Sequence, residues 1–224
     1  MKKSAVREIV IIGAGGHGSE LISYLQDLRD AGEPVRLMGF VDENKAPGPF
    51  LGSKILGGFQ ELRAFLRRRA GRPIYYLTAV GNNKTRLKLV GKIERMKAKG
   101  FLPWMLRHPS ANVGRRVEIG EGTCLAPGSL VTTRVRMGRH CILNVQASIS
   151  HDCVIGDFVN INPHAAVCGN VKIGEGCTIG AGAIVIESVS IGEWSVIGAG
   201  AVVIDDIPSR VTAVGIPARA VKAS

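Results

Sequence analysis

The second half of the chain carries a Val, Ile, Leu or Met at every sixth position. This series runs from Val113 to Val203 without a gap. Four positions after each member lies a small or β-branched residue, from Val117 to Ile207. An α-helix would place its apolar residues three and four positions apart, so a strict period of six excludes an amphipathic helix.

Such a hexapeptide repeat predicts a parallel β-helix. Each repeat forms one short strand and one turn, and three repeats close a triangular coil. The aliphatic residue fills the interior of the coil, and the small residue allows the corner to close. Glycine often follows the aliphatic residue, as in IGEG and IGAG, and we expect it there because glycine tolerates turn conformations.

The first half alternates the signals of buried strands and amphipathic helices up to about residue 106. Short apolar runs indicate parallel strands, and apolar residues at helical spacing indicate helices between them. The predicted strands cover 8–13, 35–42 and 73–80, and the predicted helices cover 18–32, 58–71 and 83–100. This order favours a small Rossmann-like domain at 1–106, followed by the β-helix domain at 107–224.

The chain has 224 residues and a formal net charge of +11, which leaves two interpretations open. One is a solvated basic surface, and the other is an anionic partner. Aromatic side chains that stack on bases are few and no nucleic-acid-binding motif is present, so phosphorylated small molecules are favoured over nucleic acid. No apolar run approaches the ~20 residues that span a bilayer, and we expect a cytoplasmic protein without a signal peptide or a membrane partner.

The spacing of cysteine and histidine residues argues against redox and metal chemistry. The five cysteines show no CxxC motif, so reduced thiols are expected. Histidine ligands from successive coils should recur near multiples of eighteen, but the three histidines of the repeat region are separated by 11 and 13 positions. We therefore expect no metal site. The cysteines that take the inward small position, and are expected to be buried structural thiols, are Cys141, Cys153 and Cys177.

A glycine-rich segment follows the first predicted strand and opens the first predicted helix. It reads GAGGHG and fits the GxGxxG pattern, in which backbone amides hold a phosphate at a helix N-terminus. Asp42 ends the second strand, where a carboxylate can bind a ribose or a base. The alternative is a tight strand-to-helix turn without a ligand. The residues predicted to bind the nucleotide here are Gly13, Gly15, Gly16, His17 and Asp42.

Asn82 and Lys84 follow the third predicted strand. Because the carboxyl ends of parallel strands share one edge of the sheet, these two side chains are expected to line the same cleft. A helix cap and a solvated lysine are the alternatives for them.

Taken together, the two halves of the chain resemble the sugar O- and N-acyltransferases of the left-handed β-helix superfamily. The group that it resembles most contains sialic acid O-acetyltransferases and UDP-4-amino-sugar N-acetyltransferases of the bacillosamine type. The resemblance rests on VIIGAGGHGSEL, GFVDEN and AVGNNKTR in the first half. In the second half it rests on HPSA, NVQASISHDCVIGDFVNINPHA, GNVKIGEGCTIGAGAIV and VGIPARAVK.

This resemblance implies a left-handed β-helix, acetyl-CoA as co-substrate, and a sugar nucleotide as acceptor. It also implies a homotrimer in which CoA lies between neighbouring coils of two chains. Asn144 is assigned by the resemblance to the acceptor. The residues assigned by the resemblance to acetyl-CoA are Asn160, Gly169, Arg210, Arg219 and Lys222. A basic C-terminal tail without a ligand is the alternative for the last three of these.

His151 lies two positions after the inward Ile149, so it should project outward near a corner of the coil. The alternative is an ordinary surface histidine. The neighbouring Asp152 can orient the imidazole, and the resemblance assigns the catalytic base to His151. Gly169 follows one coil later, so its amide is a candidate donor to a developing oxyanion.

Position 160 departs from the pattern of the family. The family segment reads HDCxIGDFVHI, and Asn160 stands where a second histidine is usual. Asparagine can donate or accept a hydrogen bond, but it cannot act as an acid at neutral pH. The identity of the acceptor and the pose of the thioester therefore stay open.

The favoured function is acetyl-CoA-dependent N-acetylation of a nucleotide-linked amino sugar. Direct transfer with His151 as general base needs no covalent intermediate on the protein. O-acetylation of a sialic acid or another sugar is an alternative within the same class. A non-catalytic trimeric scaffold that binds a sugar nucleotide is the alternative from another class.

Overall fold

The computed structural model describes residues 5–69 and 72–223, with side chains up to residue 221. The chain divides into two compact units, Met1–Trp104 and Met105–Ser224. The change of period in the sequence predicts a boundary close by, after residue 106.

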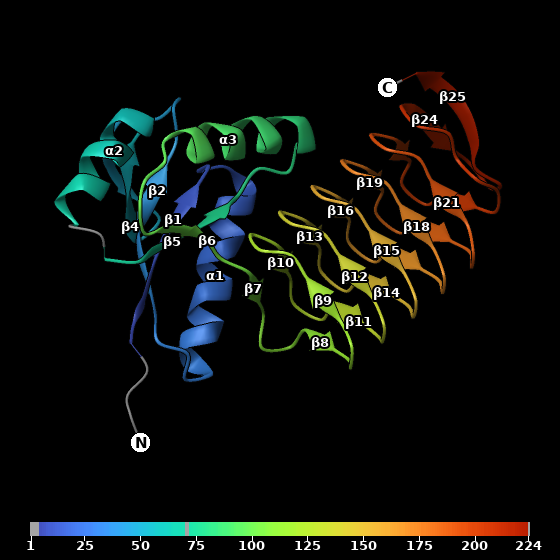
Figure 1. Cartoon of the computed structure of the whole chain (residues 1–224), viewed down its shortest axis with the longest axis horizontal. Coiled ribbons are helices and arrows are strands. Elements are labelled where there is room, and N and C mark those ends of the chain that lie inside the picture. The colour runs from blue at the N-terminus through green and yellow to red at the C-terminus, as the bar shows by residue number, and fades with distance from the viewer. Residues whose placement is uncertain (1–4, 70–71, 224) are drawn as a thin grey trace. The chain divides into compact units, whose positions relative to one another are not determined.

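Six strands form the sheet of the first unit, in the spatial order β3-β4-β2-β1-β5-β6 (Figure 1). All neighbouring strands run parallel except β3 and β4, which form an antiparallel hairpin at one edge. The central strand β1 is apolar and buried from Ile9 to Ile12, which suits a strand covered on both faces. The strands are β1 Arg7–Ile12, β2 Val35–Val41, β3 Gly48–Phe50, β4 Ser53–Gly57, β5 Ile74–Thr78 and β6 Phe101–Pro103.

Three helices cover this sheet: α1 Gly16–Asp30, α2 Phe59–Arg68 and α3 Asn83–Arg95. Phe59 and Leu62 of α2 and Ile93 of α3 pack with Val10 and Ile12 on one face of the sheet. Helix α1 lies on the other face (Figure 1). The predicted Rossmann-like domain is confirmed. The β3–β4 hairpin is absent from the sequence prediction because its strands are short, and because the glycine and proline of β3 favour turns.

The second unit consists mainly of two-residue strands that stack in parallel into three sheets, and it ends in a longer antiparallel pair of strands, β24 and β25 (Figure 1). The first β-helix sheet contains β7 Leu106–Arg107, β10 Cys124–Leu125, β13 Ile142–Leu143, β16 Asn160–Ile161, β19 Thr178–Ile179, β22 Val196–Ile197, β24 Val211–Val214 and β25 Arg219–Ala223. The second contains β8 Asn112–Val113, β11 Leu130–Val131, β14 Ser148–Ile149, β17 Ala166–Val167, β20 Ile184–Val185 and β23 Val202–Val203. The third contains β9 Glu118–Ile119, β12 Arg136–Met137, β15 Val154–Ile155, β18 Lys172–Ile173 and β21 Ser190–Ile191.

The repeating aliphatic residue is the second residue of each short strand and points into the prism. These residues are buried from Leu125 to Val203, and the small residues are buried from Thr123 to Ala201. Both sets belong to one continuous core in which each residue stacks on its equivalent in the next coil. The predicted left-handed parallel β-helix of hexapeptide repeats is therefore confirmed.

The corners of the prism correct one expectation about glycine. The left-handed backbone region is taken by another corner residue, as at Asp152 with φ 61° and Phe158 with φ 57°. The glycine that follows the aliphatic residue does not adopt it. A Cβ at Gly156 or Gly174 would instead lie 2.7 or 2.6 Å from a backbone nitrogen of the next coil. Glycine is required there by the close approach of two coils rather than by the turn.

Candidate active site

His151 and Asp152 form the tip of a corner between β14 of the second β-helix sheet and β15 of the third. The buried Ile149 and the buried Cys153 anchor the two sides of this corner in the core. The His151 side chain is 52% exposed, whereas that of Asp152 is 31% exposed. The outward position that the spacing from Ile149 predicts for His151 is the one that the structure shows.

Asp152 connects His151 to an arginine of the preceding coil. Oδ2 of Asp152 lies 2.8 Å from Nδ1 of His151. Arg134 donates to the same carboxylate with both ends of its fork, from Nε to Oδ1 at 2.6 Å and from Nη2 to Oδ2 at 2.7 Å. The sequence prediction did not include Arg134. Its place eighteen residues before Asp152, one full coil, is the signal that could have found it.

The arginine determines the protonation state of the carboxylate. The hydrogen bond from Arg134, followed by the one from His151, holds the pKa of Asp152 well below its usual range. The pKa of Arg134 is raised by its hydrogen bond to Asp152. Asp152 is therefore a carboxylate near neutral pH and accepts a hydrogen bond from the Nδ1–H group of His151. That tautomer leaves the lone pair of Nε2 available to accept a proton from a ligand.

Gly169 lies directly beside the His151 ring, one coil further along. A Cβ at Gly169 would lie 2.5 Å from Cε1 and 2.7 Å from Nε2 of His151, so no larger side chain fits beside the ring in this position. The backbone of His151 accepts a hydrogen bond from the Asn170 amide at 2.9 Å. Within the described residues, the Gly169 amide has no hydrogen-bond acceptor. An imidazole base and an unpaired amide donor therefore lie side by side.

The corner cysteines are packing residues. Burial raises the pKa of the Cys153 thiol, and it raises the pKa of Cys177 to about 11. Thiols in this state are poor nucleophiles near neutral pH. The predicted structural role of Cys141, Cys153 and Cys177 agrees with their burial.

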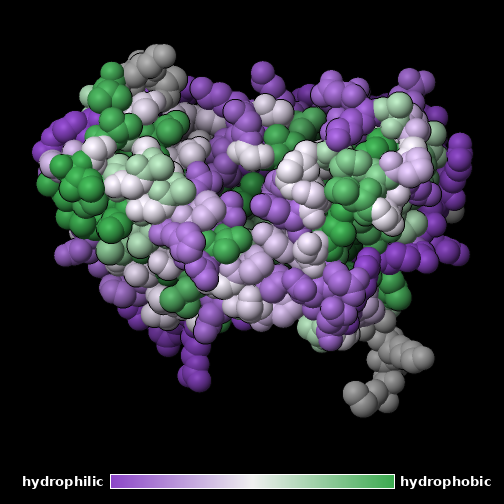
Figure 2. Space-filling model, turned by 180° about the vertical axis from the view of Figure 1, so that it is seen from behind, coloured by the Kyte–Doolittle hydropathy of each residue, from purple (hydrophilic) through white to green (hydrophobic). Residues whose placement is uncertain are grey.

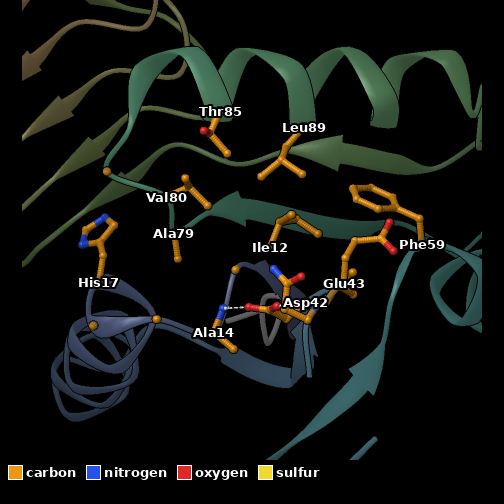
Figure 3. Close-up of a pocket in the computed structure, with 16 residues that line it drawn as sticks. Ile12, Ala14, His17, Asp42, Glu43, Phe59, Ala79, Val80, Thr85 and Leu89 are labelled. Atoms are coloured by element: carbon orange, nitrogen blue, oxygen red, sulfur yellow. Dashed lines mark hydrogen bonds between the residues drawn. The ribbon is translucent and has the colours of Figure 1, made fainter. Parts of the chain in front are cut away.

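A second candidate site is a pocket of about 430 Å³ in the first unit, at the carboxyl ends of β1, β2 and β5 (Figure 3). Open parallel sheets bind ligands at this end of their strands. The labelled side chains of Phe59, Thr85 and Leu89 lie on one side of the pocket, and Ala14 and Asp42 lie on the other (Figure 3). The predicted nucleotide residues Gly13, Gly15, Gly16, His17 and Asp42 all line this pocket.

The glycines of the GAGGHG segment have two different functions in the structure. Gly13 adopts φ 103°, and a Cβ there would lie 3.0 Å from the Ala79 carbonyl oxygen, so the turn itself requires glycine. Around Gly15 and Gly16 nothing lies within 4 Å of an added Cβ. These two glycines leave open space at the N-terminus of α1, where backbone amides can approach a phosphate.

Asp42 holds the pocket together through two backbone hydrogen bonds. Its Oδ2 accepts from the Ala14 amide at 2.9 Å, and its Oδ1 accepts from the Asn44 amide at 2.9 Å. The first bond links the glycine turn to the end of β2. Each carboxylate oxygen keeps a further lone pair, so Asp42 can fix the turn and still accept a hydrogen bond from a ligand hydroxyl.

The His17 ring, drawn at the opposite end of the pocket from Phe59, is nearly buried (Figure 3). Its Nδ1 lies 2.9 Å from Oε2 of Glu20. Its Nε2 is buried and has no hydrogen-bond partner among the described residues. A buried ring nitrogen without a partner is costly, so this atom is suited to a hydrogen bond with a ligand in the pocket.

Asn82 and Lys84 do not belong to the lining of this pocket. Asn82 is the N-cap of α3, and its side chain accepts from the Thr85 amide at 2.9 Å. The helix-cap alternative for Asn82 is therefore the contact that the structure shows. Lys84 is exposed on the first turn of α3.

Two predicted residues of the second unit lie away from His151. Asn144 lies at the corner after β13, and its side chain accepts from the Val145 amide at 2.8 Å. Asn160 is buried on β16 in the first β-helix sheet. His151 lies at the corner between the other two sheets, so one chain does not bring Asn144 or Asn160 to His151.

The three basic residues near the C-terminus do not form one cluster. Strands β24 and β25 pair as an antiparallel hairpin, with Val211 opposite Ala223 and Val214 opposite Arg219. Arg210 therefore lies at one end of the hairpin, where it pairs with Glu193 at 2.8 Å. Arg219 lies at the other end and pairs with Asp205 at 2.9 Å.

The side chain of Lys222 lies outside the described residues. Arg210 and Arg219 each bind a carboxylate of a neighbouring chain segment, and the assignment of both residues to CoA stays a prediction. Both ion pairs are exposed, and an anionic ligand can compete with them.

Among the described side chains, no group of three or more His, Cys, Asp and Glu residues is arranged to hold a metal ion. None of the helices in the described part of the chain is long and apolar enough to span a membrane.

Two family models match the chain, one in each unit. Residues 8–93 match the PglD N-terminal domain, and residues 170–205 match the bacterial transferase hexapeptide model of six repeats. The first match covers the sheet and pocket of the first unit. The second match covers coils that follow His151.

One curated relative is GDP-perosamine N-acetyltransferase from Escherichia coli O157:H7, 33% identical over 153 residues. That match covers 66% of this chain and 64% of the relative, so the chain spans somewhat less than two thirds of the length of that protein.

Solved structures match over nearly the whole chain. A variant of perosamine N-acetyltransferase from Caulobacter crescentus, in complex with CoA and GDP-perosamine, is 33% identical with a TM-score of 0.82, covering 97% of this chain and 98% of that chain. The acetyltransferase domain of PglB from Neisseria gonorrhoeae FA1090, in complex with acetyl coenzyme A, is 30% identical with a TM-score of 0.85. This match covers 97% of this chain and 100% of that chain. The resemblance inferred from the sequence is thereby confirmed. The chain belongs to the family of hexapeptide-repeat sugar N-acetyltransferases that join a PglD-type N-terminal domain to a left-handed β-helix.

Proposed function

We propose that this protein transfers the acetyl group of acetyl-CoA to the amine of a nucleotide-linked amino sugar, with His151 as the general base. The observation that carries the proposal is the exposed imidazole of His151, bonded at Nδ1 to Asp152 and lying against Gly169. The relatives described above support it, because they include structures in complex with CoA and GDP-perosamine.

The acyl transfer would proceed directly between the two substrates. The amine nitrogen attacks the thioester carbonyl, and Nε2 of His151 removes a proton from that nitrogen. The Gly169 amide donates to the oxyanion of the tetrahedral intermediate. The intermediate then breaks its C–S bond, and the CoA thiolate takes the proton back from the imidazolium. The products are the acetamido sugar and CoA with a free thiol.

The nucleotide of the acceptor would bind in the pocket of the first unit. The open space at Gly15 and Gly16 admits a phosphate to the N-terminus of α1. Asp42 and Nε2 of His17 offer a hydrogen-bond acceptor and a buried polar atom to the rest of the nucleotide. The net charge of +11 favours anionic substrates at this protein in general.

Acetyl-CoA would extend from Gly169 toward the C-terminal end of the prism. Asp205 lies near the same corner as His151 in the last coil, and Arg219 is paired with it. Arg219 is therefore placed to exchange its carboxylate for a phosphate of CoA. Arg210 lies at the far end of the hairpin, and Lys222 is assigned to CoA by the resemblance alone.

A homotrimer would complete each site with a second copy of the chain. Asn144 and Asn160 lie away from His151 within one chain, so they can reach the thioester or the acceptor only from a neighbour. Apolar side chains on the outside of the prism are available for such contacts, including Leu130 and Ile184. Hydrophobic residues gather on the surface at the left of Figure 2. The C-terminal hairpin and its turn also expose Val214, Ile216 and Val221.

The test is release of free thiol from acetyl-CoA in the presence of GDP-, UDP- and CMP-linked sugars, each with and without a free amine. We expect release only with an amino sugar, together with a product that carries one acetamido group by mass spectrometry. Acetylation of a hydroxyl would convert the assignment to O-acetylation. A protein that shows no thiol release and no thermal shift with acetyl-CoA would be a scaffold, because a ligand at ~100 times its dissociation constant should stabilise by about 2.7 kcal/mol.

A further inference from the structure

The guanidinium of Arg134 holds the carboxylate of Asp152 in one orientation. Nε donates to Oδ1 at 2.6 Å and Nη2 donates to Oδ2 at 2.7 Å, so the two planar groups face each other as a fork. Oδ2 also accepts the bond from Nδ1 of His151 at 2.8 Å. One carboxylate oxygen is thus shared between the arginine and the imidazole.

The stacking of coils places Arg134 there. Arg134 and Asp152 occupy the same corner position in successive coils, and both adopt left-handed backbone angles, with φ 53° and 61°. The Asp152 amide donates to the Thr133 carbonyl at 3.2 Å, which fixes the register of the two corners. Equivalent positions in neighbouring strands lie about 4.8 Å apart, a separation that an Arg–Asp pair spans.

We infer that Arg134 is a positioning residue for the proposed acyl transfer, in which it acts on His151 through Asp152. This inference rests on the proposed function of His151. By binding both oxygens, Arg134 keeps Oδ2 aimed at Nδ1 and so keeps the lone pair of Nε2 directed outward. Without the arginine, the Asp152 side chain is free to turn toward solvent, and the imidazole loses the contact that selects its tautomer.

Arg134 also balances the charge beside the base. When His151 takes a proton, an unpaired carboxylate would stabilise the imidazolium and slow the return of the proton to the leaving thiolate. The shared hydrogen bond divides the negative charge of Asp152 between two cations. Among the described residues, Arg134 is the charged side chain that bonds to the dyad, and Cys153, Gly169 and Asn170 adjoin it from its own and the following coil.

An ordinary surface ion pair is the alternative, and the chain contains a matched example. Arg139 and Asp157 are also eighteen residues apart, at another corner of the same coils, with Nε of Arg139 3.1 Å from Oδ2 of Asp157. The side chains of that pair are 41% and 36% exposed, close to the 51% and 31% of Arg134 and Asp152. The Arg139 pair lies at a different corner from His151, so Arg139→Gln controls for the loss of one inter-coil ion pair.

The experiment compares Arg134→Gln and Arg134→Lys with Arg139→Gln in the full-length protein. For Arg134→Gln we expect kcat to fall about 10-fold, with KM for both substrates unchanged within about 2-fold, because only the base is affected. Arg134→Lys should recover part of the loss, since a single ammonium keeps the charge without the fork. Arg139→Gln should keep kcat within about 2-fold, as expected for an exposed pair.

Two further measurements separate positioning from stability. The acidic limb of the kcat/KM profile should move to higher pH in Arg134→Gln, because the variant removes a positive charge from the neighbourhood of His151. Nitrogen NMR of the ligand-free protein should show His151 protonated at Nδ1 in the wild type and as a mixture of tautomers in Arg134→Gln. The same NMR spectrum in Arg139→Gln should match the wild type.

Wild-type kcat, pH profile and tautomer in Arg134→Gln would overturn the inference, as would an equal loss of kcat in Arg139→Gln. The NMR measurement needs no turnover. A wild-type protein that acetylates no acceptor, but whose His151 tautomer depends on Arg134, would refute the proposed function and retain Arg134 as the residue that orients His151.

Discussion

At the scale of single residues, the adjacent side chains of His151 and Asp152 have different contacts because the backbone directs them toward different coils. Asp152 takes the left-handed conformation, which aspartate tolerates better than most residues, and turns back toward the preceding coil. His151 precedes it in the chain and lies over Gly169 in the following coil. The imidazole is thus held between two coils while its ring stays half exposed.

Replacement of His151 by Ala should lower kcat by at least ~100-fold, because a positioned general base contributes about 10² to 10⁴. The rate of thiol release from acetyl-CoA measures this. His164→Ala is the control, since His164 is an exposed histidine at a different corner. Similar rates for both variants would remove His151 from the reaction.

Gly169→Ala should lower kcat at least ~10-fold while the melting temperature changes little. The new Cβ would lie 2.5 Å from Cε1 of His151, so the ring must swing away from the amide. Gly169 is not in the left-handed backbone region, so alanine brings no backbone strain. Full activity in this variant would show that the base does not operate beside Gly169.

Asp152→Asn should reveal the charge of the carboxylate through the pH dependence of stability. The native pKa of Asp152 is lowered, chiefly by Arg134, so its stabilising contribution is present above the unfolded pKa of about 3.9 and is lost as the pH falls below it. We expect the wild type to melt above Asp152→Asn by a constant margin from pH 5 to 8, and the margin to shrink below about pH 4. Differential scanning calorimetry measures it, and a margin independent of pH would contradict the ionic role.

At the scale of the element, a strand of two residues has one side chain that points into the core and one that points to solvent. In β15, Ile155 is 2% exposed and Val154 is 38% exposed. The stability of the prism therefore depends on one aliphatic residue in each strand, stacked on its equivalents in the adjoining coils.

Ile155→Ala should destabilise the protein by about 2–5 kcal/mol, because the stacked neighbours cannot close the cavity. Val154→Ala, in the same strand, should change stability by less than about 0.5 kcal/mol. Urea unfolding followed by circular dichroism measures both. Equal effects would mean that the outer face of β15 is covered in the assembled protein.

At the scale of the whole molecule, the assembly decides whether the proposed site is complete. Asn160 is buried on one sheet, and His151 lies at the corner between the two others. Residues on separate sides of a rigid prism cannot meet within one chain. They can meet between two copies.

Light scattering should give a mass near three times the 23.8 kDa of the chain. Trimers assembled from mixtures of His151→Ala and wild-type chains should then lose activity in proportion to the mutant fraction, since each site uses one His151. A monomer with full activity would contradict the homotrimer and the shared site.

The repeat of six by itself determined the β-helix, because the inside of a narrow prism admits one kind of residue at one position in every strand. The alternating periods determined the Rossmann-like domain, and the glycine segment determined where its pocket lies. Ile149 gave the outward direction of His151, and one coil of eighteen residues gave its contact with Gly169.

Only the tertiary structure decided which partners these residues take. The bidentate bond of Arg134 to Asp152, the cap formed by Asn82, and the separate ion pairs of Arg210 and Arg219 depend on side-chain directions that no period encodes. A repeat specifies which residues lie one coil apart. Whether the side chains of two such residues form a hydrogen bond depends on the backbone angles and, for Arg134 and Asp152, on how the guanidinium faces the carboxylate. These features exist only once the coils are stacked.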